Sequence, residues 1–304
     1  MIVINLILII LSALLAIAFY TLRERKFIGY IQYRKGPNKP TIIALTIPLG
    51  DAGKLVFKEE KNTISNNLKY FICAPTIIII ISIFLWSIYP HLYQSSFLKF
   101  RIIFFLCITR IRVYATFIAG WGSNSKWRIL GALRSVAQTI SYEVRISLII
   151  ICFIMHSIRI NILSIIRNQY TWIIFICLPL IIIWILSIIT ETHRAPIDFT
   201  EGESELVSGF NIEYRRSIFA LIFIAEYINI LFLRILTSAI LTKNWSNIEL
   251  VIKATLLSII FIWTRRTFPR LRYDILINCL WKKILPLSLT WFILLIPVIT
   301  KIIA

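Results

Sequence analysis

Charged residues are scarce in this sequence, and acidic ones are the scarcest. Of 304 residues, 14 are Asp or Glu and 33 are Lys or Arg, so 15% are charged while 59% are hydrophobic. Soluble domains carry about a quarter charged residues. Apolar runs such as 76–88 and 172–189 approach or reach the roughly 20 residues that cross a bilayer as a helix. The composition argues against a soluble protein and predicts an all-α integral membrane protein.

Paired cysteines are also lacking. No C-x-x-C motif occurs, so we expect no iron–sulfur cluster and no other metal site on this chain alone. No secretory cleavage pattern follows the first apolar run, and we therefore interpret residues 2–20 as a retained helix. The five cysteines stand singly, mostly in apolar stretches: Cys73, Cys107, Cys152, Cys177 and Cys279.

The apolar runs predict one membrane domain, 1–304, with about eight spans. These lie near 2–22, 68–89, 100–120, 136–157, 171–190, 217–240, 249–264 and 284–303. The net charge of +19 is concentrated in connections beside the spans, which indicates membrane orientation and anionic head groups and not nucleic acid. By the positive-inside rule, the loops 23–67, 121–135, 191–216 and 265–283 face the matrix or cytoplasm. No internal repeat is visible, which disfavours an inverted-repeat transporter.

The first of these loops contains a periodic segment after Pro48. Apolar and polar residues alternate there with helical spacing, which predicts an amphipathic helix lying in the membrane interface. A solvated loop helix is the alternative. The apolar positions are Leu49, Ala52, Leu55 and Val56, and the polar ones are Asp51, Lys54, Lys58 and Glu59.

The few carboxylates cluster, and their placement suggests proton chemistry. About half lie between residues 191 and 213, and two more, Glu143 and Glu226, fall inside apolar spans. A carboxylate inside the membrane is destabilised as an anion and can exchange protons, so a water-linked chain of them forms a proton relay. A solvated acidic loop is the alternative for the cluster. Its members are Glu191, Asp198, Glu201, Glu203, Glu205 and Glu213.

A basic cluster covers residues 23–26 and 34–35, interleaved with Phe27, Tyr30 and Tyr33. Such a mixture suits an amphipathic ligand with a polar head and an apolar tail. The alternative is that these basic residues only anchor and orient the helix by the positive-inside rule and bind no ligand.

These charged segments resemble, in the right order, subunit 1 of NADH:ubiquinone oxidoreductase (respiratory complex I) of the mitochondrially encoded type. The similarity covers about residues 20 to 290 and is most specific at 201–214. The matching stretches are 24–26, 29–32, 34–38, 120–126, 131–134, 137–144, 191–198, 201–214, 219–220, 225–227, 269–274 and 281–282.

The resemblance implies a subunit in the mitochondrial inner membrane that forms the inner part of a chamber for its substrate, ubiquinone. Electrons would arrive from an iron–sulfur cluster on a neighbouring subunit, so no catalytic residue is expected on this chain alone. The implied partners are hydrophilic-arm and membrane-arm subunits and phospholipid, including cardiolipin. By position, the quinone tunnel would involve Glu24, Arg25, Arg34 and Asp51. The acidic loop (Glu191, Asp198, Glu201, Glu203, Glu205 and Glu213) would respond to quinone reduction, Glu143 and Glu226 would pass the response on, and Arg194, Arg270, Arg272 and Asp274 would support the loop.

Several arginines clash with both the family pattern and the bilayer, because one charge at a helix centre costs roughly 2.5–3.5 kcal/mol on insertion scales. Isoleucine makes up roughly a fifth of the chain against two Met. In invertebrate mitochondria AGA encodes serine and AUA encodes methionine. One hypothesis therefore explains both oddities: the sequence was translated with another genetic code, which turned some serines into arginines and some methionines into isoleucines. The alternative is that pairing or snorkelling accommodates the charges. The arginines concerned are Arg110, Arg112, Arg145, Arg215, Arg216 and Arg234.

Two other functions remain open from the sequence. A standalone proton or ion transporter would use Glu143 and Glu226 as substrate sites, and it should work alone in liposomes. A membrane anchor of a related hydrogenase-type complex shares part of the loop pattern, but such anchors generally lack the match from residue 29 to residue 38.

Overall fold

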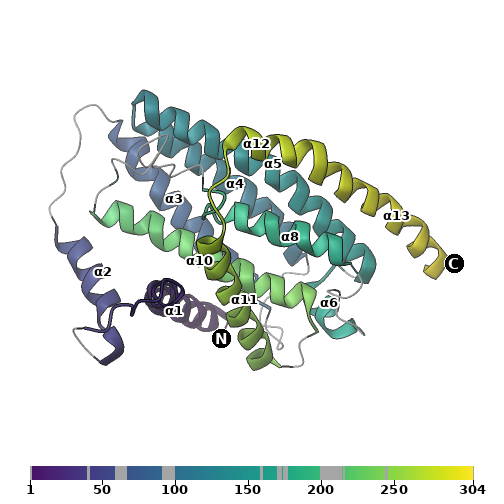
Figure 1. Cartoon of the computed structure of the whole chain (residues 1–304), viewed down its shortest axis with the longest axis horizontal. Helices are drawn as coiled ribbons and strands as arrows, with labels where there is room; N and C mark the ends of the chain where they lie inside the picture. Colours follow the sequence, from purple (N-terminus) through teal and green to yellow (C-terminus); the bar gives the residue numbers. More distant parts are fainter. Residues whose placement is uncertain are drawn as a thin grey trace.

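The computed structural model describes residues 2–39, 42–58, 67–90, 100–157, 160–169, 173, 177–198, 214, 216–243 and 246–303. These residues form helices and loops, with no strand among them (Figure 1). The main helices are α1 (Ile2–Ile31), α2 (Ile47–Phe57), α3 (Leu68–Trp86), α4 (Arg101–Gly122), α5 (Lys126–Ser157), α6 (Ile162–Asn168), α8 (Leu178–Glu191), α10 (Arg216–Leu241), α11 (Asn247–Thr267) and α12 (Tyr273–Cys279), which continues through a π-helical turn, η3 (Leu280–Ile284), into α13 (Leu285–Ile303).

Within the described residues, seven helices are long and apolar enough to cross a bilayer: α1, α3, α4, α5, α10, α11 and the continuous helix that begins at Tyr273. The helix α8 is apolar but, with 14 residues, is shorter than a membrane span. Residues 174–176, which precede it, are not among the residues that the structure describes. Large apolar side chains such as Ile7, Leu8 and Leu11 of α1 are exposed. A helix whose exposed side chains are apolar is suited to contact with lipid. The expectation of an all-α integral membrane protein is confirmed.

Three helices extend beyond the predicted spans. The helix α1 continues to Ile31, α5 begins at Lys126 instead of near 136, and α12 begins at Tyr273 instead of near 284. The expected loops 23–67, 121–135 and 265–283 are therefore shorter than predicted, and much of the basic cluster is helical. Charged residues end an apolar run, but they do not interrupt the backbone hydrogen bonds of a helix, so hydropathy misplaces these ends.

The helix predicted after Pro48 is present as α2, with the proline in its first turn, where its missing N–H costs nothing. None of its residues is buried. It lies at one side of the molecule beside α1, which Figure 1 shows nearly end-on. Its placement in a membrane interface stays a prediction.

The interior is formed where α3, α4, α5 and α10 pack together, with α8 and α13 both packed against α5 (Figure 1). Trp184 of α8 contacts Phe153 of α5, and Phe105 of α4 contacts Phe232 of α10, all four being buried. Close approach of α4 to α5 depends on Gly120, where an added Cβ would lie 2.2 Å from the Cβ of Ala132. Small residues permit such crossings in membrane helices.

Candidate functional site at the buried carboxylates

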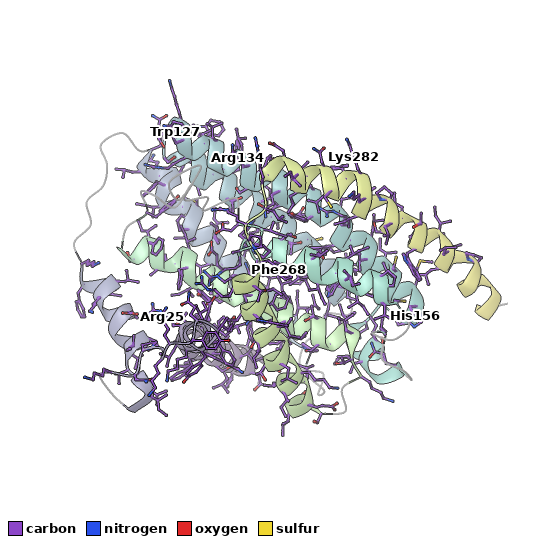
Figure 2. The ribbon with its side chains drawn as sticks, viewed as in Figure 1. Arg25, Trp127, Arg134, His156, Phe268 and Lys282 are labelled. Carbon is purple, nitrogen blue, oxygen red and sulfur yellow. The ribbon has the colours of Figure 1, made fainter. Side chains whose placement is uncertain are left out.

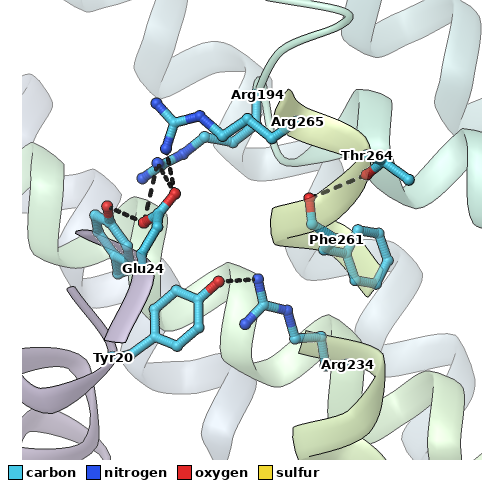
Figure 3. A network of polar contacts seen from close by, with 8 residues as sticks. Tyr20, Glu24, Arg194, Arg234, Phe261, Thr264 and Arg265 are labelled. Carbon is cyan, nitrogen blue, oxygen red and sulfur yellow. Dashed lines mark hydrogen bonds and ion pairs between the residues drawn. The ribbon is translucent and has the colours of Figure 1, made fainter. Parts of the chain in front are cut away.

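Glu24 near the end of α1 holds a carboxylate that is almost completely buried, at 5% exposure. Arg194 Nη1 donates to Oε1 at 3.2 Å, and the Tyr227 hydroxyl donates to Oε2 at 2.7 Å. Arg265 Nη1 also donates to Oε1. Figure 3 shows Arg194 and Arg265 converging on the Glu24 carboxylate, from the loop after α8 and from α11. A buried anion is stable only with such compensation, so these contacts fix Glu24 as an ionised group.

The loop residue Arg194 is held on two sides. Its guanidinium carbon lies 4.3 Å from the centre of the Tyr227 ring, and its other contact is Glu24. Burial alone would lower the pKa of Arg194, but Tyr227 and Glu24 together outweigh that effect and raise it. The side chain therefore stays charged.

One helical turn before Glu24, Tyr20 occupies the same face of α1. Arg234 of α10 donates to the Tyr20 hydroxyl and lies 4.4 Å above the Tyr20 ring and 5.5 Å above that of Phe261. The Arg234 Nε and Nη1 atoms are buried without a hydrogen-bond partner in the described part of the chain. Polar side chains from α1, α10 and α11 thus enclose one pocket (Figure 3).

Two cavities meet at this pocket. A small one of about 20 Å³, enough for about one water molecule, is lined by Glu24, Arg194, Arg265, Tyr20 and Arg234. A larger one of about 590 Å³ lies between α1, α10 and α11 and is also lined by Tyr20 and Arg234. Its other walls are mostly apolar, among them Ala13, Ala16, Phe19, Leu231, Ile235 and Val251. A polar pocket therefore adjoins an apolar one.

The other predicted quinone residues lie outside this pocket. Arg25 Nη1 is 3.1 Å from Asp51 Oδ2 in a half-exposed ion pair that joins α1 to α2. Figure 2 labels Arg25 on the side of the molecule where α1 and α2 lie. Arg34 donates from Nε to Gln32 Oε1 at 2.9 Å in an exposed turn. The structure thus brings Arg25 and Asp51 together but leaves Arg34 separate from Glu24.

A second group of carboxylates surrounds Arg112 of α4. Arg112 Nη1 lies 3.5 Å from Glu191 Oε1, with both side chains below 10% exposure. Glu191 ends α8, whereas Glu143 on α5 lies within electrostatic range of Glu191 and Arg112. Glu226 of α10 and Arg112 line one small cavity. The predicted relay residues Glu143, Glu191 and Glu226 therefore lie near Arg112, and Glu143 is also within electrostatic range of Arg110.

His193 closes the same cavity from the loop after α8 and is buried. Burial, with a smaller contribution from Arg112, lowers its pKa from about 6.5 to about 3. The imidazole is therefore neutral at physiological pH. Sequence reasoning did not single out His193, since a lone histidine in a loop gives no pattern.

The loop after α8 is held mainly through its backbone. The Gln138 side-chain amide of α5 donates to the carbonyls of Thr190 and Ile197, at 3.3 Å each. The Leu271 N–H donates to the Pro196 carbonyl at 3.1 Å. Arg272 and Asp274, which we predicted to support this loop, pair with each other at the surface, with Arg272 Nε 3.3 Å from Asp274 Oδ2. Arg270, the third predicted support, is exposed.

Asp198 lies at the end of this loop, half-buried. The predicted residues Glu201, Glu203, Glu205 and Glu213 lie outside the described residues. Where the structure is described, no three His, Cys, Asp or Glu side chains group as metal ligands do.

The charged residues that gather at these sites all lie between residues 4 and 296. Residues 4–296 match the model of the NADH dehydrogenase family. The chain belongs to this family. NADH-ubiquinone oxidoreductase chain 1 of Aedes aegypti is 45% identical over 96% of this chain and 94% of its own length. The corresponding proteins of Anopheles gambiae and Nycticebus coucang are 46% and 42% identical, over 93% and 95% of this chain and 91% and 94% of their own lengths. In this NADH dehydrogenase chain, the Glu24 pocket uses Tyr227 and Arg265, which the sequence did not assign to it.

Proposed function

We propose that this chain is the chain 1 subunit of a proton-translocating NADH–ubiquinone oxidoreductase and helps to bind ubiquinone. The observation that carries this proposal is the junction of two cavities at Tyr20 and Arg234. Ubiquinone has a polar head and a long apolar tail. The polar pocket at Glu24 offers hydrogen-bond donors and acceptors, and the adjoining cavity of about 590 Å³ offers an apolar wall for a tail.

The hydrogen-bonding groups of this pocket favour binding of a quinone head. Glu24 is bonded to Arg194, Arg265 and Tyr227, so the pocket is polar without exposing a bare anion. The nearby Arg234 has unused N–H groups. Those groups can donate to a carbonyl oxygen, which is the hydrogen-bonding group of a quinone.

We further propose that Glu143, Glu191 and Glu226 couple quinone reduction to proton movement. They come from α5, α8 and α10 and share the surroundings of Arg112. The loop that carries Arg194 also begins at Glu191, so a change at the Glu24 pocket reaches the carboxylates through residues 191–194. A relay built from carboxylates in water-linked contact needs this proximity.

The setting of the subunit is part of the proposal. The basic ends of α1 and α11, with Arg25, Lys26, Arg265 and Arg266, would face the matrix side of the mitochondrial inner membrane. There they would meet hydrophilic-arm subunits, and exposed apolar helices would meet membrane-arm subunits and phospholipid, including cardiolipin. A standalone transporter would instead move protons in liposomes without partners.

The decisive experiment is Glu24→Gln in the assembled complex. Removal of the anion leaves Arg194 and Arg265 without their counter-charge and reorganises the pocket. We expect the apparent KM for ubiquinone to rise about tenfold, which corresponds to about 1.4 kcal/mol. Arg25→Ala, in a half-exposed pair, should raise it less.

Glu249→Gln is the matched control, because Glu249 pairs with Lys253 in the first turns of α11, at the opposite end of that helix from Arg265. It should leave the KM for ubiquinone unchanged. An unaltered KM in Glu24→Gln, with the complex assembled, would remove the Glu24 pocket from quinone binding.

A further inference from the structure

The loop that carries Arg194 to the Glu24 pocket is held at both ends by one side chain of α5. The Gln138 amide nitrogen, Nε2, donates to the carbonyl oxygens of Thr190 and Ile197, at 3.3 Å each. Thr190 lies in the last turn of α8, before Arg194, and Ile197 lies three residues after it. The three residues that form this bridge are at most 3% exposed. Their hydrogen bonds are therefore shielded from competition by water.

The chemistry of the bridge requires the amide of Gln138. A side-chain amide nitrogen carries two N–H groups, so it can donate one to each carbonyl oxygen. The opposite orientation of the amide would set its oxygen against two other oxygens. Of the side chains with this size and shape, Glu has at most one proton to donate and Met has none. Gln alone among them can bridge two carbonyl groups.

Both carbonyl groups belong to residues that are hydrogen-bonded to the backbone at positions 193 and 194. The Thr190 oxygen also accepts from the His193 N–H at 3.3 Å, and the Ile197 N–H donates to the Arg194 carbonyl at 3.0 Å. His193 has a φ of 49°, a left-handed conformation that non-glycine residues rarely adopt and that surrounding contacts must hold. The Gln138 bridge therefore acts on the short turn that presents Arg194.

The contact that Arg194 makes at the end of this turn tolerates little displacement. Its Nη1 lies 3.2 Å from Glu24 Oε1, and its guanidinium carbon lies 4.3 Å from the centre of the Tyr227 ring. A backbone shift of about 1 Å would take Nη1 out of hydrogen-bond range. Gln138 itself lines neither of the two cavities that meet at the pocket.

We propose that Gln138 is a positioning residue for ubiquinone binding, which holds the loop after α8 so that Arg194 reaches Glu24. The inference rests on the proposed function of the Glu24 pocket. It adds a residue on α5, outside that pocket, on which the geometry of the pocket depends. Side chains that support the groups in contact with a ligand act in this way, by fixing the position of those groups.

Gln138→Met in the assembled complex tests the proposal, because methionine keeps the size of the side chain and donates no hydrogen bond. We expect the KM for ubiquinone to rise about threefold to tenfold, the effect of roughly one lost hydrogen bond, while kcat at saturating ubiquinone is nearly unchanged. A merely structural role would lower the amount of assembled complex and leave this KM unchanged. Gln138→Glu, which has the same shape and donates at most one proton, should raise the KM in the same range and serves where Gln138→Met does not assemble.

Gln169→Met is the matched control. Gln169 is also buried and also donates its side-chain amide to a backbone carbonyl, that of Ile240 at 2.6 Å. That bond lies near the C-terminal end of α10 and not at the loop after α8. Gln169→Met should therefore leave the KM for ubiquinone unchanged, and an equal rise in Gln138→Met and Gln169→Met would overturn the proposal.

A double-mutant cycle with Arg194→Ala separates this inference from the proposed function. If Gln138 acts through Arg194, adding Gln138→Met to Arg194→Ala should raise the KM further by no more than about twofold. A full additional rise in that background, or an unchanged KM in Gln138→Met when Arg194→Ala raises it, would overturn the positioning role alone. An unchanged KM in Arg194→Ala would overturn the proposed function of the pocket and this inference with it.

Discussion

The Tyr227 hydroxyl of α10 donates a 2.7 Å hydrogen bond to Glu24 Oε2 of α1, across 203 positions of the sequence. Tyr227 also lies beneath the guanidinium of Arg194. One aromatic side chain therefore orients both members of the buried pair: its hydroxyl holds the carboxylate, and its ring holds the cation.

Replacement of Tyr227 by Phe should loosen this arrangement without breaking it. The ring remains beneath Arg194, and Arg194 and Arg265 still compensate the anion. The loss is therefore confined to the contacts of the hydroxyl, of which the charge-assisted hydrogen bond to Glu24 is worth about 1.5–3 kcal/mol. We expect an assembled complex whose KM for ubiquinone rises less than in Glu24→Gln. Steady-state kinetics with a short-chain quinone measure this. Tyr70→Phe, at an exposed ring, is the matched control and should have no effect; an equal rise in both variants would contradict the role of Tyr227.

The Glu143→Gln variant tests the relay separately from quinone binding. The amide keeps the size and a carbonyl but removes the exchangeable proton. We expect slower quinone-linked proton pumping, by a factor of about ten or more in line with lost acid–base function, with the KM for ubiquinone nearly unchanged. Proton uptake measured in proteoliposomes beside NADH oxidation separates the two effects. Pumping at the normal rate would exclude Glu143 from the relay.

Acid should destabilise the fold through His193. In the folded chain its pKa is about 3, and in the unfolded chain about 6.5. Below pH 6.5 the unfolded chain therefore binds a proton that the folded chain does not, so stability is lost as pH falls from about 6.5 towards 3 and is constant above that window. Each unit of difference between the two pKa values corresponds to about 1.4 kcal/mol of stability.

The measurement is the apparent Tm of the complex in detergent at pH 7.5 and 5.5, in the natural chain and in His193→Asn. The natural chain should lose more stability than the variant, which has no imidazole to protonate. If the two proteins lose the same amount of stability, the pKa of His193 does not differ between the folded and unfolded chain.

The sequence predicted more of the helices than of the site. Long apolar runs coincide with the seven helices of the described residues that are long enough to cross a membrane, because burial in lipid leaves a strong signal along the chain. Helix ends were misplaced at Lys126 and Tyr273, where charged residues continue the helix. The partners of Glu24 are 170, 203 and 241 positions away. Only packing of α1 against α10, α11 and the loop after α8 brings them together, and no local pattern encodes that packing.

The same limit applies to Arg112 and Glu191, which lie on different helices and meet only in the folded chain. One part of the Glu24 pocket did have a local signal. Tyr20 precedes Glu24 by four residues on a helix, a spacing that places both on one face. Applied to residues 20–24, that rule predicts a shared pocket.

Close packing of α4 against α5 gives the sharpest test of the fold. At Gly120 an added methyl group would lie 2.2 Å from the Cβ of Ala132, well inside van der Waals contact, and both residues lie on helices. Because neither backbone can yield without moving a helix, Gly120→Ala should destabilise the chain by about 1–3 kcal/mol, as overpacked cores do. Gly50→Ala is the matched control, since nothing lies within 4 Å of its added Cβ on α2; it should be neutral or slightly stabilising because alanine favours helix. Thermal unfolding in detergent compares the two, and equal stability of both variants would show that α4 and α5 do not cross at Gly120.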